Sequence, residues 1–177
     1  MNRMKVFLFA LFLTSILFGS SCSLLKPSSI SKTSTTQNNN LNNQKDIKAD
    51  YSNLQQIGMA ISIYSSDHKQ DLPDDLSLLF EERILPDDCI VLFHNPVSKT
   101  KPTLKLLKEN KADYLYLGKG QNMMSIDDPS KTPILITRPG LFLEDFINIL
   151  FADLHVEGCR NYKNNPILIE QIKNQKK

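Results

Sequence analysis

Histidine side chains are the first candidates for catalysis or metal binding in this chain of 177 residues. His68, His94 and His155 share no ligand spacing, and none completes a metalloenzyme motif with a nearby cysteine or carboxylate. The sequence also contains no Gly-x-Ser-x-Gly nucleophile elbow and no glycine-rich phosphate loop. We therefore expect a protein that is not an enzyme and that uses no cofactor, metal or small-molecule substrate.

Three aspartates offer one alternative, a calcium site. Calcium prefers several loop carboxylates and carbonyl oxygens, which Asp127, Asp128 and Asp153 could supply. The pair Asp127-Asp128 is better explained as part of a solvated turn, because a proline follows it. His155 is likewise better explained as a residue of a β-hairpin than as a ligand.

Cysteine chemistry indicates covalent modification near the N-terminus. Arg3 and Lys5 precede the apolar run 6–19, which is too short to span a bilayer comfortably and is followed by small residues. These are the features of a bacterial-type export signal. The segment Gly19-Ser20-Ser21-Cys22 resembles the lipobox of bacterial lipoproteins, although its first residue is glycine where that motif has Leu, Val or Ile. The resemblance implies cleavage before Cys22 and acylation of its thiol.

An acylated Cys22 would hold the chain on a membrane without a spanning helix, because each buried methylene contributes about 0.8 kcal/mol of membrane affinity. We therefore expect residues 1–21 to be a removed signal peptide. The mature protein would lie in the cell envelope, on the outer membrane or the periplasmic face of the inner membrane. The alternatives are a secreted protein, after ordinary cleavage behind Ser21, and an uncleaved N-terminal anchor.

Cys89 and Cys159 remain as an even pair in a compartment that permits disulfides. Closing the long loop between them would stabilise the fold by about 4 kcal/mol in the chain-entropy model. Two free, buried thiols are the alternative.

The mature chain divides into a polar tether and one folded domain. Residues 22–45 are rich in Ser, Thr, Asn and Gln, a composition that buries too little apolar surface to fold, and we expect a flexible tether there. Residues 46–177 form the predicted domain. Removal of Arg3 and Lys5 from the 21 basic residues leaves 19, which balance the 19 acidic residues, so no nucleic-acid partner is expected.

The domain opens with the clearest helix of the sequence, predicted from Asp46 to near Asp67. Asp50, like Asp46, is expected near its start, where carboxylates are favoured by the helix dipole. A short helix is predicted over 75–83, and a closing helix over 166–172. Apolar residues recur at spacings of three and four on one face of the first helix, namely Tyr51, Leu54, Ile57, Gly58, Ile61 and Tyr64.

Extended segments follow the helices. Strands are predicted over 114–117, 134–137, 146–152 and 155–158, and the last two form a hairpin around a tight turn. Helices first and antiparallel strands afterwards is the order of an α+β fold.

Three segments resemble a known family. Residues 53–61, followed by Tyr64 and Leu72-Pro73, are similar to the "NLKQIGLALxxYxxDxxxxLP" segment of type II secretion pseudopilins. Residues 149–157 are similar to the "vlFaDGHVe" strand-turn-strand of the pilin-like proteins named for a His-x9-Asp-Gly motif, and residues 113–118 to their "YxYlg" strand. The resemblance implies a pseudopilin-like fold with a long N-terminal helix packed on a small antiparallel sheet.

The chain also departs from that family. It has an export signal and a tether where pilins have a long apolar stem, and Leu143 and Leu154 replace the His and Gly of the named motif. We therefore expect a non-enzymatic, membrane-tethered pilin-like lipoprotein, accessory to a type II secretion or pilus-like system, with Met59 and Ile63 as its partner-binding surface. A structural envelope lipoprotein or a secreted binding protein is the alternative.

Overall fold

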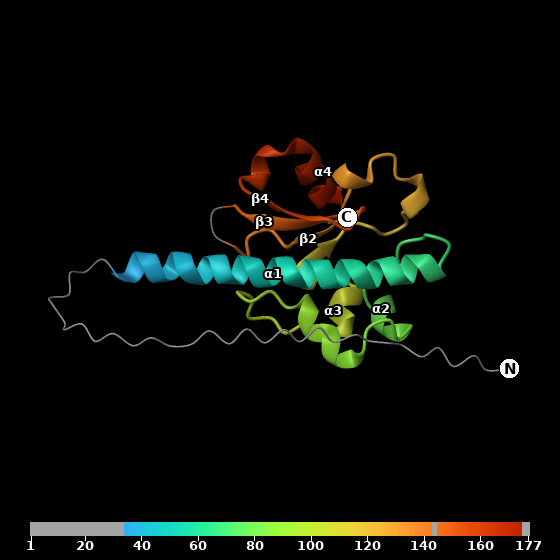
Figure 1. Cartoon of the computed structure of the whole chain (residues 1–177), viewed down its shortest axis with the longest axis horizontal. Coiled ribbons are helices and arrows are strands. Elements are labelled where there is room, and N and C mark those ends of the chain that lie inside the picture. The colour runs from blue at the N-terminus through green and yellow to red at the C-terminus, as the bar shows by residue number, and fades with distance from the viewer. Residues whose placement is uncertain (1–33, 143–144, 175–177) are drawn as a thin grey trace, which may run out of the picture. The chain divides into compact units, whose positions relative to one another are not determined.

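The computed structural model describes residues 34–142 and 145–174, and side chains from Gln44 onward within these ranges. A long helix lies across a small antiparallel sheet, and shorter helices pack around both (Figure 1). The predicted α+β fold class is confirmed at this level. The predicted signal peptide 1–21, the acylation site Cys22 and the tether residues before position 34 lie outside the described residues.

Helix α1 spans Ser34–Asp67. Its end agrees with the prediction, but its start does not, because residues 34–45 were expected in the flexible tether and are helical here. The chain leaves the helix through two left-handed residues, Lys69 (φ 55°) and Gln70 (φ 72°), and the Gln70 amide donates to the Ser65 carbonyl at 2.7 Å. This is the hydrogen bond of a Schellman motif, which ends helices efficiently.

The four strands form one antiparallel meander in the order β1-β2-β3-β4. All four lie where the alternation and turn signals predict them. Their bounds are β1 Tyr114–Tyr116, β2 Pro133–Thr137, β3 Ile147–Phe151 and β4 Val156–Cys159.

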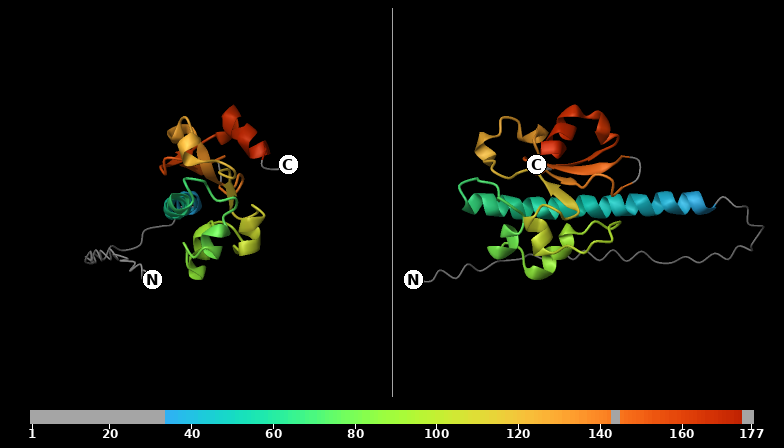
Figure 2. Two further views of the ribbon diagram at one scale, coloured as in Figure 1. Left: turned by 90° about the vertical axis from the view of Figure 1, so that its right-hand side faces the viewer. Right: turned by 180° about the vertical axis from the view of Figure 1, so that it is seen from behind.

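The sheet is covered on both faces (Figure 2). Helix α1 packs on one face, where its side chains Leu54, Ile57 and Ile61 are fully buried with Leu135 and Leu150 of the sheet. Helix α4, Pro166–Asn174, covers the other face over a second apolar cluster. The predicted closing helix is thereby confirmed.

Helix α1 approaches the sheet closely at Gly58. A Cβ atom at this position would lie 2.9 Å from Leu150 Cδ1, which is too close for an unstrained contact. Glycine therefore allows the helix backbone to rest directly on β3.

The lower side of α1 in Figure 1 is flanked by α2 (Leu78–Glu81), a 3-10 helix (Asp87–Phe93) and α3 (Leu104–Lys108). Helix α2 is shorter than the predicted 75–83. Asp75 accepts hydrogen bonds from the amide and the hydroxyl of Ser77, and residues 76 and 77 therefore form a turn before the helix. These elements contribute Leu79, Phe93 and Leu107 to the core under α1.

Asn110 joins the end of α3 to the edge of the sheet. It adopts the left-handed conformation (φ 51°) just after the helix, and the Lys111 amide behind it donates to the Leu106 carbonyl at 2.7 Å. Its side-chain amide donates to the Tyr116 carbonyl at 2.9 Å and accepts from the Tyr116 amide at 2.8 Å. One side chain thus occupies the outer edge of β1, where a further strand would otherwise pair.

The β3–β4 turn places Leu154 in the left-handed region (φ 72°). This conformation costs a non-glycine residue roughly 1–2 kcal/mol, which a glycine would avoid. Glycine, however, loses more conformational entropy on folding, which costs about 0.5–1 kcal/mol. We expect Leu154→Gly to raise the free energy of unfolding by up to about 1.5 kcal/mol, measured by urea denaturation. Gly140 (φ 91°) provides the reverse test, since Gly140→Ala should lower stability. A loss of stability in Leu154→Gly would show that the leucine side chain outweighs the strain.

Candidate functional site

The exposed side of α1 contains the two residues that the sequence predicts as a partner-binding surface. Met59 and Ile63 are 58% and 49% exposed, unusually high values for large apolar side chains in the middle of a packed helix. They lie one helical turn apart, so their side chains are neighbours on the helix surface.

These two residues belong to a longer pattern. Six exposed positions of α1 alternate at intervals of three and four residues, and all six are uncharged. We call this set the neutral seam; it consists of Ala49, Ser52, Gln56, Met59, Ile63 and Ser66.

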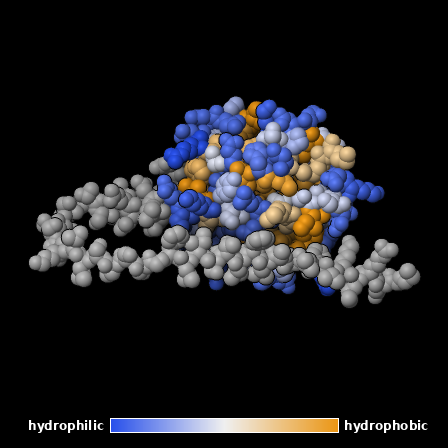
Figure 3. All heavy atoms as spheres, in the orientation of Figure 1, coloured by the Kyte–Doolittle hydropathy of each residue, from blue (hydrophilic) through white to orange (hydrophobic). Residues whose placement is uncertain are grey.

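Five of the six seam residues, all except Ala49, lie in a segment with no charged residue, from Tyr51 to Ser66, in a chain of which 23% is charged. Figure 3 shows the face of the molecule on which α1 lies, where hydrophobic residues stand among hydrophilic ones. Exposed helix faces usually bear charge, whereas the centres of protein interfaces are depleted in charge and enriched in methionine. The composition of the seam therefore favours protein binding over simple solvation.

Asp50 lies on the opposite, buried side of α1. Its carboxylate is completely inaccessible to solvent and accepts four hydrogen bonds from neutral donors. One oxygen accepts from Asn95 Nδ2 at 2.7 Å and from the Tyr114 hydroxyl at 2.8 Å. The other accepts from Thr137 Oγ1 at 2.6 Å and from Asn148 Nδ2 at 2.7 Å. We call these five residues the Asp50 network.

Burial raises the pKa of the Asp50 carboxyl, while the four hydrogen bonds oppose this effect. Burial also raises the pKa of the Tyr114 phenol, and the neighbouring Asp50 charge adds to that increase. Tyr114 therefore remains a donor to Asp50, and its own oxygen lies 3.5 Å from the donor Asn53 Nδ2. The network is fully satisfied, as buried polar groups must be if they are not to cost stability.

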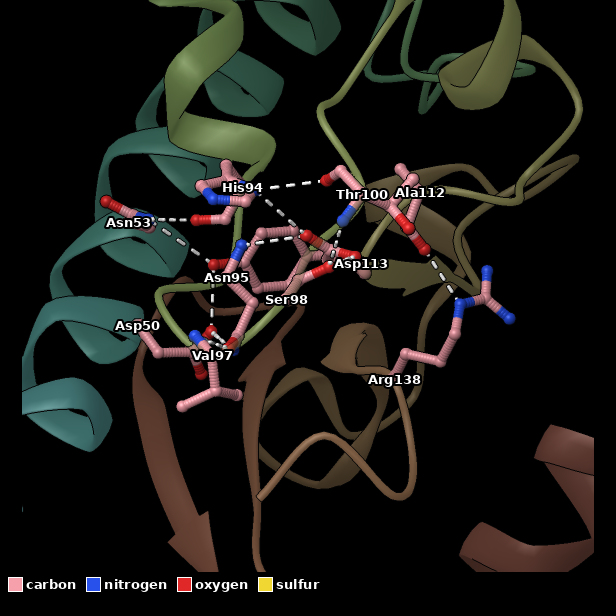
Figure 4. Close-up of polar contacts among 11 residues, drawn as sticks. Asp50, Asn53, His94, Asn95, Val97, Ser98, Thr100, Ala112, Asp113 and Arg138 are labelled. Carbon is pink, nitrogen blue, oxygen red and sulfur yellow. Dashed lines mark hydrogen bonds and ion pairs between the residues drawn. The ribbon is translucent and has the colours of Figure 1, made fainter. Parts of the chain in front are cut away.

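A second carboxylate continues the network into the loop before α3 (Figure 4). Asp113 accepts from the Asn95 amide at 2.9 Å and from Ser98 Oγ at 2.7 Å. Asn95 therefore bridges two carboxylates, with its side chain on Asp50 and its backbone on Asp113. His94 Nδ1 lies 3.4 Å from Asp113 Oδ2 and 3.2 Å from the Thr100 carbonyl.

The Asp50 network positions α1. Its donors come from the loop before α3 and from strands β1, β2 and β3, so one carboxylate fixes the helix against four segments. The prediction that Asp50 stands near the helix start was wrong, because α1 begins at Ser34. One feature of the sequence could have indicated that Asp50 is buried: it stands four residues before Leu54, on the same apolar face of the helix.

The three histidines lie apart and form no common site. His68 stacks on Tyr64 and lies 3.1 Å from Glu82, while His94 lies beside Asp113. His155 belongs to the predicted hairpin, where it stacks on Phe151 at the turn. Among residues 34–142 and 145–174, no three His, Cys, Asp or Glu side chains gather where they could hold a metal ion.

Two of the three aspartates of the calcium alternative, Asp128 and Asp153, have separate partners. Asp128 bonds Ser130 and Lys131, and the Lys131 ammonium holds the pKa of this carboxyl below its usual value. Asp153 contacts His155 at 2.5 Å; burial opposes ionisation there, but the hydrogen bonds from His155 keep the pKa of Asp153 low.

Cys89 and Cys159 are free thiols, which corrects the expectation of a disulfide between them. Cys89 packs against the core under α1, whereas Cys159 packs against the cluster under α4, on the other face of the sheet. Burial raises the pKa of both thiols, and the nearby carboxylates of Asp88 and Glu157 add to this.

An open cavity of about 500 Å³ lies at the C-terminal end of α1 and is lined by polar residues such as Asp67, Asp71 and Asp74. Another cavity, of about 280 Å³, lies between α4 and the sheet. The buried Oε1 of Gln171 at its wall has no hydrogen-bond partner within the described chain.

None of the helices within 34–142 and 145–174 has both the length and the apolar character needed to cross a membrane. In comparisons with known proteins, no family model, no curated protein and no solved structure matches this chain.

Proposed function

We propose that this chain is a non-enzymatic, membrane-tethered lipoprotein with a pilin-like fold, and that it is an accessory or structural component of a type II secretion or pilus-like system. The observation that carries the proposal is the neutral seam, an uncharged helix face that is exposed in the isolated chain. The export signal, Cys22 and the resemblance of three ordered segments to pseudopilins support the cell-envelope setting. The long helix across a four-stranded antiparallel sheet is compatible with the same proposal.

The seam is well suited to dock another protein, because α1 is held rigidly behind it. The Asp50 network and the apolar core fix the helix, so binding through its outer face costs little conformational entropy. A bound partner would cover Met59 and Ile63, whose exposed apolar side chains gain the most free energy when they are removed from water.

Met59→Lys/Ile63→Lys tests the docking role. Both side chains are largely exposed, so the variant should keep its fold and lose association with secretion or pilus subunits that co-purify with the wild-type chain from membranes. Met124→Lys/Ile167→Lys is the matched control, because these side chains are 83% and 70% exposed and neither lies on α1. If the wild-type chain brings down no such subunits, the secretion role is wrong and the envelope lipoprotein alternative takes its place.

Acylation of Cys22 is tested by intact mass of the membrane-extracted protein. The wild-type chain should lack residues 1–21 and carry acyl chains, whereas Cys22→Ala should lose the acyl mass and leave the membrane fraction. An unmodified mature wild-type chain in the soluble fraction would contradict the lipid anchor.

A further inference from the structure

The neutral seam has the spacing of a coiled-coil interface. Its six residues alternate at intervals of three and four, which is the spacing of a and d positions, and all are exposed on one side of α1. Seen along its axis, α1 lies at the outside of the described domain, with the sheet and the shorter helices behind it (Figure 2). A second helix can therefore approach α1 along the whole length of the seam.

We propose that the neutral seam of α1 binds the same seam of a second copy of this chain, with the two helices antiparallel. This inference rests on the docking role proposed above: it names a second copy as the protein that the seam binds, and the paired chain as the form that associates with the other subunits. A two-fold axis through the middle of the seam makes the contact closed and self-complementary, as in most homodimers.

The residue sizes complement each other at two of the three kinds of layer in this orientation, and the central layer pairs Gln56 with Met59. With a positions opposite d positions, Ser52 of one copy meets Ile63 of the other, so a small residue receives a large one. At the outer layer, Ala49 meets Ser66, and two small residues let the helices approach closely. In a parallel pair, each residue would meet its own copy, so that Ile63 faces Ile63 and Ser52 faces Ser52, and the helix separation would have to change along the pair.

The charges at the two ends of the seam also favour the antiparallel pair. Two exposed lysines, Lys45 and Lys48, stand at its N-terminal end, whereas an exposed aspartate and an exposed lysine, Asp67 and Lys69, follow its C-terminal end. A parallel pair would place Lys45 against Lys45. An antiparallel pair instead brings the lysines of each copy toward the end of the other copy where Asp67 balances Lys69, so that the like-charged ends stay apart. The two helix dipoles then point in opposite directions, which is favourable.

The paired segment is short, since Ala49 to Ser66 spans about 26 Å of helix. Such an interface lies at the small end of protein contacts, so the free dimer should be weak and reversible. Attachment of both copies to one membrane would raise their effective concentration and favour pairing there.

Site-specific cross-linking in membranes tests the orientation. Two differently tagged full-length chains are co-expressed, one with Ser52→Cys and the other with Ile63→Cys, and oxidised mildly. We expect a disulfide between the two tagged copies at a yield several-fold above that of unsubstituted chains, which share the native cysteines. Ser52→Cys in both copies is the control, and it should give only the background yield. Cross-linking of the control pair alone would show a parallel contact and overturn the proposal.

Sedimentation of the detergent-extracted full chain tests the contact itself. The wild-type chain should show a concentration-dependent dimer, which Met59→Lys/Ile63→Lys abolishes and Met124→Lys/Ile167→Lys preserves, with unchanged circular dichroism in both. A chain that stays monomeric and gives no specific cross-link, yet co-purifies with secretion subunits, overturns the dimer and leaves the proposed function standing. A dimer that co-purifies with no such subunits overturns the proposed function alone.

Discussion

Replacing Asp50 by alanine is expected to lower the free energy of unfolding by about 3–5 kcal/mol. The substitution removes one acceptor group and leaves four buried donors, on Asn95, Tyr114, Thr137 and Asn148, without their partner. Each buried, unsatisfied donor costs about 1–3 kcal/mol, and local relaxation recovers part of the sum. Since small domains are stable by only about 5–15 kcal/mol, this loss would unfold a substantial fraction of the protein near physiological temperature.

Two further variants separate the network from a general effect of changing α1. Asp50→Asn keeps the size of the side chain but turns an NH2 group toward two of the donors, so its stability should lie between those of the wild type and Asp50→Ala. Asp46→Ala removes a half-buried carboxylate from the same helix and should change stability by no more than about 0.5 kcal/mol. Urea denaturation at 25 °C measures all three, and an Asp50→Ala variant as stable as Asp46→Ala would contradict a structural role for the network.

The same carboxyl predicts a pH dependence with a definite sign. Because burial raises the pKa of Asp50 in the folded state above its unfolded value of 3.8, the folded chain binds this proton more tightly than the unfolded chain. The contribution of Asp50 to stability therefore falls as the pH rises from about 4 through the folded-state pKa. The difference in unfolding free energy between the wild type and Asp50→Asn should grow when the pH is lowered from 7 toward 4.

The elements that the sequence predicts correctly are those set by local signals. The end of α1, the four strands and the β3–β4 hairpin follow from apolar spacing and from nearby glycine and proline residues, and the structure confirms each of them. The exposure of Met59 and Ile63 could likewise be read from their place beside the apolar stripe.

The features that the sequence missed depend on distant parts of the chain. The donors to Asp50 lie 45 to 98 positions away from it, so no local pattern distinguishes this aspartate from one that caps a helix. The even number of cysteines after Cys22 suggested a disulfide between Cys89 and Cys159. The two thiols are free because they pack on opposite faces of the sheet, which a count of cysteines cannot show. The early start of α1 was hidden because polar, asparagine-rich residues have the composition of a linker.

Replacing Asn110 by alanine is the second change with a large expected effect, because one side chain serves two elements. Alanine in the left-handed conformation after α3 costs roughly 1–2 kcal/mol. The substitution also removes both hydrogen bonds between Asn110 and the backbone of Tyr116, a residue that is only 3% exposed. With these losses together, we expect Asn110→Ala to lower the free energy of unfolding by about 2–4 kcal/mol.

Asn110→Gly divides this loss into its two parts. Glycine accepts the left-handed backbone at little cost but cannot bond Tyr116, so its stability should lie between those of the wild type and Asn110→Ala. Hydrogen exchange at the Tyr116 amide should accelerate in both variants, because this amide points to the open edge of β1 once the Asn110 side chain is gone. Equal stability of the alanine and glycine variants, with unchanged protection of the Tyr116 amide, would contradict both roles. Because an uncovered strand edge can pair with another chain, we also expect both variants to aggregate more readily than the wild type at equal concentration.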